Sequence, residues 1–187
     1  TGGTGGGNIG STDGGGAVVV TRPDHAANLK QKPIYILGVG EAHSHRHISQ
    51  MHDLTVSAGV HSGKRAFEMA GLTPKEIDVC ELYDAFTIFP IIHLEDLGFC
   101  RKGEGGSFIS DGRIGPGGDC PVNTNGGGLS YCHPGMYGIF TIIEATRQLR
   151  GQGDKRQIPG AQVALAHGVG GVWSAAATAI LGTANTL

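Results

Sequence analysis

The sequence predicts an α/β fold in which a covered β-sheet packs against helices. Two observations indicate it. Segments with the composition of strands alternate along the chain with helical segments, and the strand segments are continuous apolar runs. Runs of that kind are typical of strands that are buried on both faces. The 187 residues are enough for one domain with its own hydrophobic core.

The beginning of the chain is rich in glycine, with nine glycines among the first sixteen residues. A segment of this composition loses much backbone entropy when it becomes ordered, so we expect a flexible lead-in. Residues 17–21 are apolar and β-branched and predict a buried strand, and residues 22–30 predict a short helix. Because the first residue is not Met, we expect a fragment or the later part of a longer protein.

The middle of the chain alternates between strand and helix signals. Residues 33–38 predict a strand, and residues 54–71 predict a helix that ends at a glycine C-cap. Thr73, before a proline, is a capping signal that leads into the strand predicted at residues 79–82. Residues 85–97 predict a helix that a proline at position 90 should kink or interrupt.

The last third of the chain carries a long glycine-rich segment and then regular elements. Residues 98–128 predict an extended functional loop, and residues 137–150 predict an amphipathic helix. Residues 162–166 and 175–181 predict two buried strands around a turn at residues 168–171. In α/β sheets, functional groups collect in the loops beyond the strand ends.

The net charge, the apolar content and the cysteine pattern exclude several classes of function. A net charge of −2 and a pI near 6.5 provide no basic surface, so we expect neither nucleic acid nor an anionic membrane as a partner. The chain has no apolar run of about 18 residues and no visible signal peptide. Its four cysteines form no Cys-x-x-Cys pair, which favours a reducing, cytoplasmic compartment over a disulfide scaffold.

Cys132 and His133 look at first like a nucleophile with its base. Neighbouring side chains of an extended segment leave opposite faces, so these two cannot pair with each other. We expect Cys132 to be a small buried residue. His133 precedes Pro134 after a glycine run that lets the backbone approach a ligand, and we expect it to be functional.

Two further loops begin where a predicted strand ends. His167 stands before a glycine-rich turn whose backbone N–H groups could bind a developing oxyanion, although a structural role stays open. Tyr83, Asp84 and Phe86 follow the strand at residues 79–82 and open a helix. Asp84 could serve only as an N-cap and Tyr83 only as core, but their position makes them pocket candidates.

No metal or nucleotide cofactor is expected. His43, His45 and His47 share one side of an extended strand, but no carboxylate or thiol is set to complete a metal site. The Gly38-Val-Gly40 sequence lacks the third glycine and the ribose-binding acid of a dinucleotide fingerprint.

Together these segments resemble the motifs of thiolases. The sequence Asn125-Gly-Gly, followed by His133-Pro, resembles the thiolase Asn-x-x-Gly-Gly…Gly-His-Pro motif. Residues 83–86 stand where thiolases carry Asn-Glu-Ala-Phe, and residues 167–171 stand where many carry Cys-x-Gly. Residues 12–20 resemble the thiolase Ser-Asp-Gly-Ala-Ala strand. The sequence is therefore similar to the thiolase family from about residue 12 to the end.

Three features narrow the resemblance to the sterol-carrier-protein-type, or lipid-transfer-protein, branch: residues 98–106, residues 123–125 and His167. The resemblance implies a layered α/β/α/β/α fold built from two similar halves. Residues 1–30 would be the lead-in and the tail of the first half, and residues 31–187 the C-terminal half.

The resemblance also implies a function. It predicts an acyl-CoA acyltransferase that makes or breaks a C–C bond next to a coenzyme A thioester, which is its substrate rather than a cofactor. It implies a homodimer, with a small OB-fold acyl-CoA-binding protein as a possible partner. His133 would donate to the thioester or enolate oxygen, and His167 would occupy the acid/base position. Tyr83 would replace the asparagine that holds a water.

The remaining predicted site residues fall in the same motifs. Asp84 completes the catalytic set, and the predicted substrate-binding residues are Asn125, Gly126, Gly127, Gly170 and Phe86. Ala85 stands where the branch usually carries an acid/base cysteine, and the segment with the nucleophilic cysteine is absent. Two alternatives therefore stay open: a retro-aldolase that uses Tyr83 or Tyr131, and a catalytically silent acyl-CoA or lipid-binding protein.

Overall fold

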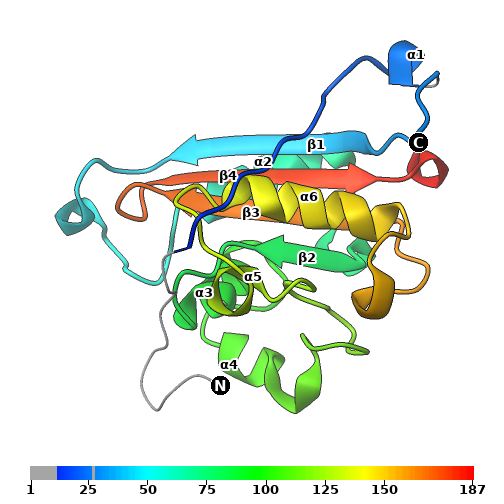
Figure 1. Ribbon diagram of the computed structural model, residues 1–187. Coiled ribbons are helices and arrows are strands. Elements are labelled where there is room, and N and C mark those ends of the chain that lie inside the picture. The colour runs from blue at the N-terminus through cyan, green and yellow to red at the C-terminus, as the bar shows by residue number, and fades with distance from the viewer. Residues whose placement is uncertain (1–11, 27) are drawn as a thin grey trace.

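A computed structural model describes residues 12–26 and 28–187 of the chain (Figure 1). Most of the predicted glycine-rich lead-in, residues 1–11, lies outside the described residues. Four strands form one sheet in the order β1-β4-β3-β2. The bounds of the strands are β1 Tyr35–His43, β2 Val79–Leu82, β3 Val163–Gly170 and β4 Ala175–Gly182. The predicted α/β fold class is confirmed.

The sheet is mixed. β4 pairs antiparallel with both β1 and β3, and β2 pairs parallel with β3. The outer edge of β2 is extended by the loop at residues 121–123, because the Cys80 N–H donates to the Pro121 carbonyl and the Asn123 N–H donates to the Cys80 carbonyl, both at 2.9 Å. This pairing brings the glycine-rich loop against the sheet.

Helices cover both faces of the sheet. α6 (Gly138–Leu149) lies on the face toward the viewer in Figure 1, and α2 (Gly59–Ala70) lies behind the sheet. α2 packs closely on β1 because a side chain on Gly38 or Gly40 would collide with backbone carbonyls of the helix. The remaining helices are α1 Pro23–Ala26, α3 Ile88–Asp96, α4 Gly105–Phe108 and α5 Gly127–Ser130, and single 3₁₀ turns span Ile48–Gln50, Pro74–Glu76, Ser110–Gly112, Asp154–Arg156 and Ala184–Thr186.

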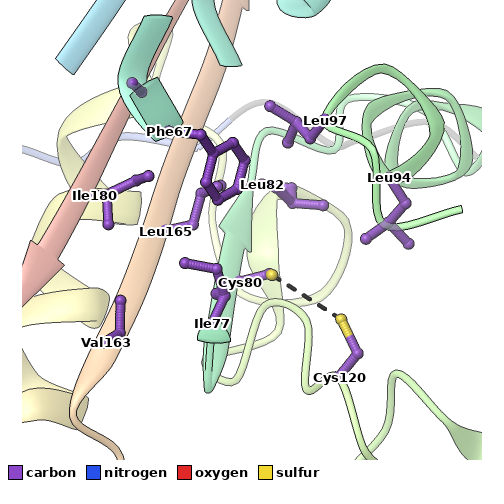
Figure 2. Close-up of a cluster of buried hydrophobic side chains, with 11 residues drawn as sticks. Phe67, Ile77, Cys80, Leu82, Leu94, Leu97, Cys120, Val163, Leu165 and Ile180 are labelled. Atoms are coloured by element: carbon purple, nitrogen blue, oxygen red, sulfur yellow. Dashed lines mark hydrogen bonds between the residues drawn. The ribbon is translucent and has the colours of Figure 1, made fainter. Parts of the chain in front are cut away.

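The main core lies on the α2 side of the sheet. Figure 2 shows Phe67 of α2 among apolar side chains from β2, β3 and β4, with Leu97 just after α3 on its other side and Leu94 of α3 beyond. Cys80 and Cys120 meet at its edge, with their Sγ atoms 4.0 Å apart. A second cluster, which includes Val79 and Ala145, fills the space under α6. Alternate residues of β2 therefore face different cores.

Most predicted elements are present with shifted bounds. The helix predicted at 54–71 begins at Gly59 and ends before Gly71, whose φ of 67° is that of a left-handed C-cap. α3 is shorter than the predicted 85–97, and its proline is the third residue of the helix. The first turn of a helix leaves its N–H groups unpaired, so proline is tolerated there without the predicted interruption.

Two local predictions are wrong. Residues 17–21 form no strand, and their side chains are exposed, with Val19 at 89%. They run across α6 (Figure 1) without a neighbouring strand in the described part of the chain, and β-branched composition predicts a strand only where such a partner exists. The turn predicted at residues 168–171 also lies later, at residues 171–174, because β3 continues through Gly170.

None of the helices among the described residues combines the length and the apolar composition needed to cross a membrane.

Candidate active site

The site forms where β2 and β3 end side by side. These two strands are parallel, and the Tyr83 N–H donates to the His167 carbonyl at 2.9 Å, which carries their pairing one residue beyond β2. The carboxyl ends of parallel strands meet at one edge of a sheet. Two of the predicted site residues are therefore backbone neighbours at that edge.

The segment at residues 123–128, called the glycine loop below, is held beside this edge by three side chains. The side-chain carbonyl of Asn123 accepts the Leu82 N–H at 2.7 Å, and that of Asn125 accepts the Gly127 N–H at 2.8 Å. One carboxylate oxygen of Asp84 accepts the Gly128 N–H at 2.6 Å. The loop conformation is thus set by hydrogen bonds to buried backbone groups.

Glycine is required at two positions of this loop. Gly126 and Gly127 have φ values of 99° and 64°, in the left-handed region that side chains disfavour. A Cβ on Gly127 would also collide with the Asp84 carboxylate. The predicted residues Asn125, Gly126, Gly127 and Asp84 therefore lie together, where they support one another.

Asp84 is buried, with only 3% of its surface exposed. Burial raises the pKa of this carboxyl, against the opposing effect of the Gly128 N–H. Its hydrogen bond is to the glycine loop rather than toward open space. The geometry makes Asp84 an anchor of the loop.

A second carboxylate cluster supports the loop from the α6 side. Glu81, fully buried in β2, accepts the Thr124 hydroxyl at 2.8 Å, and Glu144 pairs with Arg156 at 2.8 Å nearby. Burial raises the pKa of Glu81 to about 8, with a smaller contribution from Glu144, although both hydrogen bonds from Thr124 oppose the shift. Glu81 is therefore mostly protonated at neutral pH.

His133 lies in the loop before α6 and contacts Tyr83. Its Nε2 is 3.0 Å from the Tyr83 hydroxyl oxygen. The imidazole also stacks on the ring of Tyr137 at 6.0 Å and 8°, and the Tyr137 hydroxyl donates to the Asn125 side chain at 3.3 Å. The backbone N–H of His133 donates to the Thr12 hydroxyl at 2.8 Å. The ring is thereby held by Tyr83 and Tyr137, and the backbone behind it by Thr12.

Tyr83 keeps its proton at neutral pH. Burial, and next the Asp84 carboxylate, raise the pKa of this phenol above its usual value. A single proton lies in the bond between Tyr83 and His133. If the Tyr83 O–H donates it, the neutral imidazole keeps an N–H on its other nitrogen. If the His133 Nε2–H donates it, Tyr83 keeps its O–H, so one donor is free in either case. The pair can therefore present a fixed donor to a third group.

A pocket of about 530 Å³ adjoins this pair. Its lining combines five aromatic side chains with Met136 and the glycine-rich end of β3, including Gly170; the aromatic residues are Tyr83, Phe86, Phe89, Tyr137 and Trp173. Three predicted site residues thus line the pocket: Tyr83, Phe86 and Gly170. His133 lies beside it through its contacts with Tyr83 and Tyr137.

His167 is in a different environment. Only 1% of it is exposed, and its side chain points toward α2, where Nδ1 is 2.8 Å from the Thr178 hydroxyl. Burial lowers the pKa of this imidazole to about 4. Among the described residues, no hydrogen bond or ring contact joins it directly to His133. The two predicted catalytic histidines are connected through Tyr83, whose N–H donates to the His167 carbonyl, and through intervening aromatic rings.

Those rings include residues that the sequence did not single out. Phe89 packs between Tyr83 and Trp173, at centroid distances of 6.0 and 4.2 Å. His93 of α3 meets the His167 ring at 4.7 Å and 71°. A histidine in the otherwise apolar stretch 88–94, four residues after Phe89, was the available signal for this face of the helix.

Cys132 is partly exposed rather than buried as predicted, because it lies in the open loop before α6. Burial raises its pKa, so the residue is a thiol and not a thiolate at neutral pH. It is not paired with His133, whose ring nitrogen faces Tyr83.

The histidines at positions 43 and 45 point to different partners. His43 pairs with Glu41 at 2.9 Å, whereas His45 contacts the Val172 carbonyl at 2.9 Å. Within residues 12–26 and 28–187, no three His, Cys, Asp or Glu side chains are grouped as metal ligands.

Comparisons with known proteins agree with the thiolase motifs. The family model described as "Thiolase C-terminal domain-like" matches residues 40–183. The chain is 39% identical over 171 residues to acetyl-CoA acetyltransferase of Methanothermobacter thermautotrophicus, covering 90% of this chain and 45% of that protein. It is 42% identical over 110 residues to sterol carrier protein 2 of Bos taurus, covering 58% and 20%.

A solved structure gives the same result. The Ltp2–ChsH2(DUF35) aldolase superposes with a TM-score of 0.79 at 30% identity, over 88% of this chain and 43% of that one. The chain spans less than half the length of these curated relatives. The predicted resemblance to thiolases of the sterol-carrier type is confirmed, and the chain belongs to the thiolase family, of which it carries the C-terminal domain.

Proposed function

We propose that the complete protein is a thiolase-type acyl-CoA acyltransferase that makes or breaks a C–C bond next to a coenzyme A thioester. The observation that carries this proposal is the 3.0 Å contact between His133 Nε2 and the Tyr83 hydroxyl at the edge of the aromatic pocket. C–C chemistry beside a thioester develops negative charge on the carbonyl oxygen. A pre-positioned donor stabilises that charge without reorganising during the reaction.

Each site residue then has a role. His133 and Tyr83 together present one donor to the thioester or enolate oxygen, and His167 is the acid/base group. Phe86 and Gly170 contact the substrate along the pocket. Asp84 acts indirectly, together with Asn125, by fixing the glycine loop that carries His133.

The acyl-accepting cysteine comes from outside this chain. No cysteine is among the residues that line the aromatic pocket. Cys80 is fully buried, and burial raises its pKa well above the usual value, which is the reverse of nucleophile activation. We therefore expect the isolated chain not to cleave acetoacetyl-CoA in the presence of coenzyme A. Cleavage by the isolated chain would contradict this assignment.

A second candidate is a retro-aldolase acting on acyl-CoA side chains. It is favoured by the Tyr83 hydroxyl, which stands in the pocket where thiolases carry an asparagine, and by Ala85 in place of the usual second cysteine. The structural relative with a TM-score of 0.79 is itself an aldolase. Tyr131, 56% exposed, is the other tyrosine available for this chemistry.

Product analysis separates the candidates. The complete protein is incubated with acetoacetyl-CoA and free coenzyme A, and separately with a β-hydroxyacyl-CoA alone. Acyl transfer yields acetyl-CoA only when free coenzyme A is present. Retro-aldol cleavage yields a ketone or aldehyde and a shorter acyl-CoA without it. Binding of both thioesters without turnover would contradict both candidates and favour a silent acyl-CoA-binding protein.

The assembly and location follow the same proposal. We expect a homodimer, with an OB-fold acyl-CoA-binding protein as a further partner, in the cytoplasm. The four cysteines are all free thiols, as a reducing compartment would leave them. Light scattering of the complete protein, alone and with its co-purifying partners, tests the assembly. A monomer that binds no partner would contradict it.

A further inference from the structure

Under the proposed function His167 is an acid/base group, and the face of the sheet behind it shows how its proton is positioned. His167 lies on β3 with its side chain between β4 and α2. Two hydroxyl groups continue from its Nδ1. Thr178 Oγ1 is 2.8 Å from this nitrogen, and Ser62 Oγ is 2.9 Å from Thr178 Oγ1. Thr178 is 2% exposed and Ser62 is fully buried.

The last hydrogen bond of this series, between Ser62 and Gly59, sets the direction in which the hydroxyl groups donate. The Ser62 hydroxyl lies 3.3 Å from the Gly59 carbonyl, which can only accept. Ser62 has one hydroxyl hydrogen, and donating it to Gly59 leaves its oxygen to accept from Thr178. The Thr178 hydrogen is then used as well, so Thr178 Oγ1 must accept from His167 Nδ1.

A second observation leads to the same tautomer. His167 Nε2 is buried and has no hydrogen-bond partner in the part of the chain that the structure describes. A buried N–H without an acceptor is rarer in proteins than an acceptor without a donor. The hydrogen therefore belongs on Nδ1, where Thr178 accepts it, and Nε2 carries the free lone pair.

The surroundings of Nε2 contain little charge. A Cβ on Gly59 would lie 3.3 Å from it, and the ring of His93 packs against the His167 ring at 4.7 Å. His93 is fully buried, stacks on Trp173 at 5.3 Å, and is held neutral because burial and then His167 lower its pKa. Beyond it on α3, the carboxylates of Glu95 and Asp96 are paired with Lys102. The facing residues of β2, β4 and α2 are uncharged: Leu82, Thr178, Gly59 and Ser62.

We propose that Thr178 is a positioning residue, which together with Ser62 holds His167 as the Nδ1–H tautomer and leaves Nε2 as the base of the site. Removing the Thr178 hydroxyl frees Nδ1 from its acceptor, and the two tautomers of the imidazole then become comparable in energy. An imidazole with its proton on Nε2 cannot accept a proton there. The fraction of protein with a working base therefore falls as the fraction of the Nε2–H tautomer rises.

The test uses the complete protein labelled with ¹⁵N-histidine. Long-range ¹H–¹⁵N spectra at neutral pH distinguish a protonated Nδ1 from a protonated Nε2 without any reference to activity. The wild type should show His167 with the hydrogen on Nδ1 only. Thr178→Val, which keeps the shape but removes the hydroxyl, should show both tautomers. Thr178→Ser, which keeps the hydroxyl, should restore the wild-type spectrum.

The matched control is Thr141→Val. Thr141 in α6 is also 2% exposed and donates its hydroxyl to a backbone carbonyl, Gly138, at 2.8 Å. The Thr141→Val variant should leave the His167 spectrum and the activity unchanged, and it reports the general effect of losing a buried hydroxyl. A hydrogen on Nε2 in the wild type, or a Thr178→Val spectrum identical to the wild type, would overturn the proposal.

Kinetics form the second arm of the test. Thr178→Val should lower kcat/KM by at least about tenfold, up to the roughly 10⁴-fold that a wrong histidine tautomer costs a serine protease. The KM for the thioester should be unchanged, and Thr178→Ser should recover most of the rate. If the spectra change as expected but the rate does not, the tautomer assignment stands and the catalytic role of His167 in the proposed function fails.

Discussion

His133 and His167 are the same residue type in one small domain, and each contacts a hydroxyl group, but they differ in burial and in the elements that hold them. His133 lies on an open loop, contacts a tyrosine hydroxyl and stands beside a pocket. His167 lies in a central strand, is 1% exposed and contacts a threonine hydroxyl. The loop position suits a donor that meets the substrate directly. The strand position suits a base whose protonation is decided by the protein, because burial excludes the charged form.

The supports of the two histidines differ as well. His133 depends on a loop whose conformation needs glycine and buried carboxylates. His167 depends on a regular sheet and on hydroxyl groups within it. Substitutions that disturb the loop should therefore affect His133 and leave the environment of His167 intact.

The largest effect is expected from Gly127→Ala. The new Cβ would collide with the Asp84 carboxylate, and residue 127 has a φ of 64°. Overpacking costs about 1–3 kcal/mol and the left-handed conformation about 1–2 kcal/mol. We expect a lower free energy of unfolding and loss of activity, measured by urea unfolding and turnover.

Gly106→Ala is the control for this substitution. A Cβ at position 106 meets no atom within 4 Å, and its φ is not left-handed. It should leave both stability and turnover close to the wild type. Equal behaviour of the two variants would mean that the loop geometry does not position His133.

A smaller effect is expected from Tyr83→Phe. The substitution keeps the ring in the pocket but removes the hydroxyl that lies 3.0 Å from His133 Nε2. Loss of one donor to a developing oxyanion typically costs about 10²- to 10³-fold in kcat. We expect a loss near the lower figure, with the Nδ1–H tautomer of His167 unchanged in ¹⁵N spectra.

Tyr35→Phe, at the start of β1, provides the matched control and should be silent. If Tyr83→Phe keeps the wild-type rate, then the hydroxyl is not part of the donor pair. If it instead changes the His167 spectrum, the two histidine environments are not independent.

The smallest effect on turnover is expected from Glu81→Gln, beneath the His133 loop, because this substitution acts on stability. The folded-state pKa of Glu81 is about 8, above its usual 4.5. Between these values the unfolded chain releases a proton that the folded chain keeps, so stability falls as pH rises. The slope is about 1.4 kcal/mol per pH unit. The variant should be close to wild type near pH 4.5 and increasingly more stable toward pH 8.

Urea unfolding at several pH values measures this difference. Glu144→Gln is the opposite control. Burial raises the pKa of Glu144, but its hydrogen bonds with Arg156, Gln148 and Thr124 outweigh burial and hold the pKa below its usual value. Removing its charge should therefore destabilise the protein at neutral pH. A Glu81→Gln variant whose stability shows the wild-type pH dependence would contradict a protonated Glu81.

Much of the fold was predictable because it depends on local composition. β2 matches the predicted residues 79–82, since four consecutive residues are buried between two cores. β1 extends well past the predicted residue 38. The sequence did not predict this extension, because Gly40, Glu41 and His43 carry no strand composition. Their strand conformation comes from pairing with β4, which sequence periodicity does not report.

The site was predictable where the chain itself brings residues together, as in the glycine loop and the exclusion of a Cys132–His133 pair. It was not predictable where contacts join distant elements. His93 reaches His167 only because α3 packs beside β3, and Thr178 reaches it only through the β3–β4 register. The same applies to Asp84, whose role as a loop anchor depends on its contact with Gly128.

The most direct test compares two neighbouring residues in the complete protein, His133→Ala and Cys132→Ser, by the kcat for coenzyme A-dependent cleavage of acetoacetyl-CoA. His133 contacts Tyr83 beside the pocket, whereas Cys132 is a protonated thiol with no role in the site. His133→Ala should lower kcat by at least about 10²-fold, and Cys132→Ser should leave it unchanged. Equal losses in the two variants, or a wild-type rate in His133→Ala, would contradict the account.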